Sequence, residues 1–71
     1  MVLGGSGRND EAAQAFRQAT ERDPKNARYA YNLGLVLQRA GQAEAREWFT
    51  RTLALDPSFR PARERLAELS R

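Results

Sequence analysis

The stretch from Ala27 to Pro57, ARYAYNLGLVLQRAGQAEAREWFTRTLALDP, decides the fold of this 71-residue chain. Its apolar residues recur every three or four positions, which is the period of one face of a helix and not of a strand. Gly41 divides the stretch, and glycine is a common stop at the C-terminal end of a helix. The stretch therefore predicts two helices joined by a tight turn.

Local signals set the bounds of these two helices. Asn26 is a good N-cap for the first, and Asp56-Pro57 ends the second, because proline disfavours helical backbone at the residue before it. The second helix is expected from about Ala43 to Leu55. The inward residues are expected to be Ala30, Leu33, Gly34 and Leu37 in the first helix, and Ala45, Trp48, Phe49 and Thr52 in the second.

The same pattern continues on both sides of this stretch. A shift of 33 residues superposes Phe16 on Phe49 and Asp23-Pro24 on Asp56-Pro57, and a fixed period of this length is the signature of a solenoid. We expect a preceding helix from about Asp10 to Arg22 and a following helix capped by Ser58. Their apolar stripes are Ala12, Ala15, Phe16 and Ala19 in the first, and Ala62, Leu66 and Leu69 in the second, where Pro61 is tolerated in the first turn.

The fold class is thus all-α, with four short helices in antiparallel helix-turn-helix repeats that form an α-solenoid. Residues 1–6 are expected to be a flexible lead-in or a remnant of expression, because they are rich in glycine. Residues 7–71 are expected to form one domain.

The stretch from Ala27 to Pro57 resembles the tetratricopeptide repeat family. Leu33-Gly34 stands for the Leu-Gly pair of that family, and Gly41 for its mid-repeat glycine. Ala30, Leu37, Ala45, Phe49, Thr52, Leu53, Asp56 and Pro57 occupy its other positions, although Ala30 replaces a usual tryptophan, Leu37 a usual tyrosine and Thr52 a usual alanine. The resemblance implies that residues 7–24 are the second helix of one repeat, residues 27–57 a full repeat, and residues 58–71 a first or capping helix.

The resemblance also implies a function, since such repeats hold peptides or partner helices in a groove lined by the first helix of each hairpin. We therefore expect a scaffold module that binds a peptide or a helix of a partner protein. The expected binding residues are Arg28, Tyr31, Asn32, Leu35, Gln38 and Arg39 on the first helix of the full repeat, with Arg65 on the last helix. Asn32 and Arg65 match positions that relatives use to hold a terminal carboxylate, but in ordinary repeats the asparagine at this place instead bonds the backbone.

Self-association is the alternative function. The turn around Gly41 is one residue shorter than in the family, and a short hinge favours domain swapping, which would give a dimer. End-to-end stacking of copies into an oligomer is the other route, because solenoid ends normally need polar caps.

The amino-acid composition excludes most kinds of catalytic and metal-binding site. The chain has no His and no Cys, which removes the usual nucleophile pairs and nearly all transition-metal sites, so we expect no enzyme, no cofactor and no metal. The 12 basic and 9 acidic residues alternate along the chain, so nucleic-acid binding is disfavoured. No apolar run is long enough to span a membrane, and the absence of a secretory signal makes the cytoplasm the default expectation.

Overall fold

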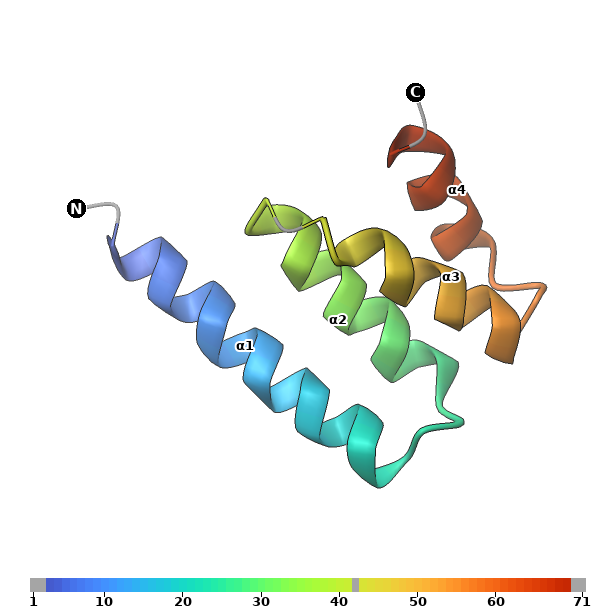
Figure 1. Ribbon diagram of the computed structural model, residues 1–71, viewed down its shortest axis with the longest axis horizontal. Helices are drawn as coiled ribbons and strands as arrows, with labels where there is room; N and C mark the ends of the chain where they lie inside the picture. The colour runs from blue at the N-terminus through green and yellow to red at the C-terminus, as the bar shows by residue number, and fades with distance from the viewer. Residues whose placement is uncertain (1–2, 42, 70–71) are drawn as a thin grey trace.

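The computed structural model describes residues 3–41 and 43–69, with the side chains of the first helix described from Asn9 onward. Its four helices are α1 (Leu3–Arg22), α2 (Ala27–Arg39), α3 (Ala45–Leu55) and α4 (Arg60–Leu69). Consecutive helices run antiparallel and lie side by side in one layer (Figure 1), and the molecule is a slab of 39 × 33 × 15 Å. The predicted all-α helical-repeat architecture is confirmed.

Helix α2 begins and ends as its sequence predicts. The side-chain oxygen of Asn26 accepts hydrogen bonds from the backbone amides of Arg28 (3.0 Å) and Tyr29 (3.3 Å), which satisfies two of the donors left free at a helix start. At the other end, Gly41 has φ +76°, a left-handed conformation that only glycine adopts without strain. The predicted N-cap and C-terminal stop are both confirmed.

The predicted start of the first helix is wrong. Helix α1 begins at Leu3 and not at Asp10, so residues 3–6, which we expected to lie in a flexible lead-in, are helical. Glycine disfavours helical backbone, but this preference is local. Here the backbone hydrogen bonds to the following turn outweigh it. Residues 1–2 of the expected lead-in lie outside the described residues.

Two smaller corrections concern α3 and α4. Helix α3 begins at Ala45 rather than about Ala43. Ser58 does not cap α4, because its backbone amide and its hydroxyl both donate to Asp56 Oδ1, at 3.1 and 2.7 Å. The helix starts two residues after it, at Arg60, and Pro61 lies in the first turn as predicted. The aspartate thus organises the α3–α4 turn in place of the serine.

The core lies where α2 and α3 cross. Leu33 and Phe49 are both fully buried, and a Cβ built on Gly34 would lie 2.7 Å from the Phe49 ring, so the absence of a side chain at Gly34 allows the two helices to approach this closely. Thr52 is buried as well, and its hydroxyl donates to the Trp48 carbonyl at 2.8 Å. The other fully covered side chains are Ala30, Leu37, Ala45 and Ala62.

Candidate functional site

The predicted binding residues of α2 form one stripe along the helix. Arg28, Tyr31, Leu35 and Arg39 follow one another at intervals of three or four residues, which places them on a single helix face. Arg28 and Arg39 are exposed at the two ends of the stripe. Tyr31, Asn32, Leu35 and Gln38 are half-buried between them. With Arg65 of α4, this set is called the α2–α4 face below.

Tyr31 joins three helices at the centre of this face. Its ring centroid lies 5.7 Å from that of Phe49 in α3 and 5.0 Å from that of Phe59, which immediately precedes α4. Both ring pairs are tilted by 48°, within the range of favourable aromatic contacts. The tyrosine ring is therefore held in place by aromatic contacts on two sides.

Arg65 is brought next to Tyr31, although the two residues lie on different helices. Interaction with the Tyr31 side chain raises the pKa of the Arg65 guanidinium, and the Glu68 carboxylate raises it further. Arg65 Nη1 donates to Glu68 Oε1 at 3.2 Å. The guanidinium is thus paired with the Glu68 carboxylate and stays charged at every physiological pH.

The sequence interpretation paired Arg65 with Asn32 and missed its contact with Tyr31. It also left out Phe59, although an aromatic residue two positions before Pro61 was a signal that the chain packs inward there. For Asn32, the alternative of a side-chain bond to the backbone is not seen within residues 3–41 and 43–69, where its amide makes no hydrogen bond. That amide is half-buried on the stripe.

The Arg28 end of the face borders a shallow hollow of about 500 Å³ at the start of α2. Its walls are Lys25, Asn26, Ala27, Arg28, Leu55, Asp56 and Phe59. Two cations and one carboxylate line it, so this end of the face carries a positive balance. The opposite end, at Gln38 and Arg39, precedes the turn at Gly41.

Other kinds of site find little support in the described part of the chain. No three His, Cys, Asp or Glu side chains cluster there in a way that would hold a metal ion. None of the helices described is both long and apolar enough to cross a bilayer.

Comparison with known proteins identifies the family of the chain. A family model described as the tetratricopeptide repeat matches residues 1–58, more than three quarters of the chain. The chain belongs to the tetratricopeptide repeat family. No curated protein and no solved structure matches the chain significantly. Tetratricopeptide repeats generally mediate interactions between proteins and form non-catalytic scaffolds.

Proposed function

We propose that this protein is an interaction module whose α2–α4 face binds an extended acidic segment of a partner protein. The observation that carries the proposal is the stripe of Arg28, Tyr31, Leu35 and Arg39 on one face of α2, with the Tyr31 ring packed against Phe49 and Phe59. A packed aromatic ring and arginines on the same face provide apolar contact area and charge-assisted hydrogen-bond donors, and such residues dominate binding energy in protein interfaces.

The charges of the face support an acidic ligand. Its seven residues include three arginines and no carboxylate, and Arg28 and Arg39 are exposed at its two ends. Glu68, which contacts Arg65, is the acidic neighbour. A partner carboxylate reaching Arg65 would compete with Glu68, which is itself exposed and held by a single contact of 3.2 Å. An exposed pair of this kind is weak, so the exchange costs little.

Leu35 gives the face an apolar centre. It is half-buried and packs against the core next to Tyr31, so part of its side chain is available to a ligand. Apolar contact at the middle of the stripe with cations at its ends is the arrangement of an interface with a hydrophobic core and a polar rim. The preferred segment should therefore carry an aliphatic or aromatic residue flanked by Asp or Glu.

Selection from a display library of random dodecapeptides tests the proposal. We expect the recovered peptides to combine acidic with apolar residues, and Arg65→Gln to weaken their binding about 5- to 10-fold through loss of a charge-assisted hydrogen bond. Arg22→Gln, which removes the same charge from the end of α1, is the matched control and should bind as the parent does. Peptides without acidic residues, or equal binding by Arg65→Gln, would refute the proposal.

Self-association stays a prediction beside this proposal. The swapped dimer and the end-to-end stacked oligomer are both still open as forms of it. The molar mass in solution, measured by light scattering over a range of concentrations, distinguishes a monomer from a dimer or a growing oligomer.

A further inference from the structure

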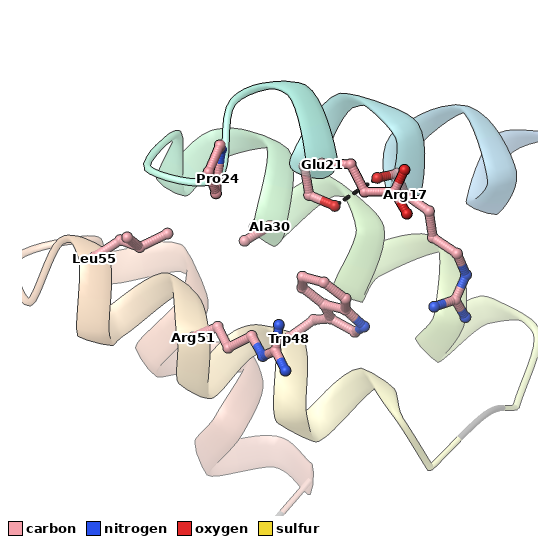
Figure 2. A pocket seen from close by; sticks show the side chains of 8 residues that line it. Arg17, Glu21, Pro24, Ala30, Trp48, Arg51 and Leu55 are labelled. Carbon is pink, nitrogen blue, oxygen red and sulfur yellow. Dashed lines mark hydrogen bonds between the residues drawn. The ribbon is translucent and has the colours of Figure 1, made fainter.

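A second surface feature lies on the side of the molecule where α1 faces α3. A cavity of about 310 Å³ opens there above α2 (Figure 2). Its lining residues are Arg17, Thr20, Glu21 and Pro24 from α1 and its following turn, Ala30 from α2, and Trp48, Arg51 and Leu55 from α3. The cavity shares no residue with the α2–α4 face, so the proposed function does not account for it.

The floor and the α3 wall of this α1–α3 cavity are apolar. Ala30 closes the bottom, the half-buried Trp48 ring forms one side, and Leu55 stands at the rim with 39% of its surface exposed. Leu55 is the most exposed large hydrophobic residue of the described chain. A cavity of roughly 150 Å³ is enough to admit benzene, so this space has room for a branched or aromatic side chain.

Arg51 supplies a cation beside that apolar space. Its guanidinium carbon lies 4.6 Å from the centroid of the Trp48 ring, a cation–π contact that holds the group beside the ring. Within residues 3–41 and 43–69, Arg51 forms no ion pair. Stacking uses the face of a guanidinium and leaves the N–H donors along its edge free for a carboxylate.

The α1 wall of the cavity differs in charge. Arg17 is engaged there by Glu44, with its two nitrogens donating to the two carboxylate oxygens at 2.9 and 3.2 Å. Glu21 adds a negative charge on the same wall and would repel a carboxylate placed near it. Glu44, at the start of α3, interacts with Arg51 at longer range but is paired with Arg17. Among the described residues that line the cavity, the cation without an ion pair is thus on the α3 side and Glu21 on the α1 side, which favours an acidic ligand whose carboxylate lies toward α3.

We infer that the α1–α3 cavity binds a peptide segment in which an aliphatic or aromatic residue is followed by an acidic residue. The apolar side chain enters between Trp48 and Leu55, and the carboxylate pairs with the edge of Arg51. This site is separate from the α2–α4 face and would let one module hold two segments at once.

The experiment uses three capped peptides, Ac-Ala-Leu-Glu-Ala-NH2, the same peptide with Gln for Glu, and the same peptide with Ala for Leu. Each is titrated to about 10 mM into the isotopically labelled 71-residue chain, because so small a contact supports only millimolar affinity. The readouts are amide chemical shifts and the indole N–H signal of Trp48, which is the only tryptophan.

The Leu-Glu peptide should give saturable shifts at Trp48, Leu55 and Ala30, and the other two peptides should bind at least about 3-fold more weakly. Arg51→Gln should remove the preference for Glu over Gln while keeping the preference for Leu, and Glu21→Gln should strengthen binding of the Leu-Glu peptide. The matched control is again Arg22→Gln, which should change neither preference.

Several outcomes would overturn this inference. They are the absence of saturable shifts around Trp48, an unchanged Glu preference in Arg51→Gln, or shifts confined to Tyr31 and Arg65. The last result would place the ligand on the α2–α4 face and would support the proposed function while refuting the second site. Conversely, shifts at Trp48 that persist in Arg65→Gln would support the cavity whether or not the α2–α4 face binds anything.

Discussion

Helices α1 and α3 carry the same three core positions of the repeat, but only those of α3 are buried. Ala45, Phe49 and Thr52 are 1%, 0% and 0% exposed, whereas Ala12, Phe16 and Ala19, which precede them by 33 positions, are half-buried. Helix α3 lies between α2 and α4, while α1 has a helix of this chain on one side only (Figure 1). Burial in this molecule thus depends on the neighbours of a helix more than on its sequence.

The largest expected difference is between the two phenylalanines. Phe49→Ala should cost about 3–5 kcal/mol, which equals the whole stability expected of so small a core. Phe49→Leu keeps the chain folded and should lower the free energy of unfolding by roughly 1–1.5 kcal/mol. Phe16→Leu should lower it by less than about 0.5 kcal/mol, because the surroundings of a half-exposed side chain can adjust to the smaller residue. Urea unfolding followed by circular dichroism measures both, and equal losses at the two positions would contradict the comparison.

Gly34→Ala should have the next largest effect. Alanine favours helix over glycine by up to about 1 kcal/mol, but its Cβ would come within 2.7 Å of the Phe49 ring, and overpacking costs roughly 1–3 kcal/mol. The net change should be destabilising. Ala67 stands at the equivalent place on α4 and is exposed, so Ala67→Gly tests the helix preference alone and should also destabilise, by about 0.5–1 kcal/mol. The protein would then be less stable with alanine than with glycine at position 34, and more stable with alanine than with glycine at position 67. If alanine were the more stabilising residue at both positions, the close approach of α2 and α3 would not contribute to stability.

The smallest effect belongs to the ion pair that links α1 to α3. The hydrogen bonds from Arg17 lower the pKa of Glu44, so the pair stabilises the fold above the unfolded pKa of the carboxyl group, and this contribution is lost as pH falls through the lower folded value. Both side chains are about 40% exposed, so Glu44→Gln should cost less than about 1 kcal/mol near neutral pH.

The same Glu44→Gln substitution should cost nothing at pH values below the folded pKa, and added salt should reduce its effect. Glu64→Gln, which removes an exposed carboxylate of α4, is the control. Unfolding midpoints measured at several pH values provide the comparison, and a loss that persists in acid would show that the pair does not act through charge.

The sequence was sufficient for the parts of the fold that depend on local chemistry. Asn26 and Gly41 end α2 as expected, because a side-chain acceptor and a left-handed glycine act within one turn of the backbone. The start of α1 was not predictable from its glycines, since helix continuation is cooperative. Ser58 was misjudged because Asp56, two residues earlier, accepts from it.

The candidate site was predicted less completely than the fold. The stripe on α2 followed from helical spacing, and Arg65 was named from the resemblance. The contact between Tyr31 and Arg65 depends on how α2 and α4 approach each other around Phe49 and Phe59, and a single sequence does not specify that distance. The α1–α3 cavity was also missed: Trp48 was expected to point inward with Phe49, but it is half-buried and lines the cavity.

The order of the helices in the layer has a kinetic consequence. Each helix packs mainly against the one before or after it in the chain, so nearly all contacts between helices join neighbours in the helix order. Chains of low contact order fold within microseconds to milliseconds, and in repeat proteins folding can start at any well-packed pair. Here the best-packed pair is α2 and α3. The backbone amides of these two helices should exchange their hydrogens with solvent last, whereas α1 and α4 should open first and independently of each other. Detachment of α1 would then remove one wall of the α1–α3 cavity, where we propose a second binding site, without unfolding the centre of the module.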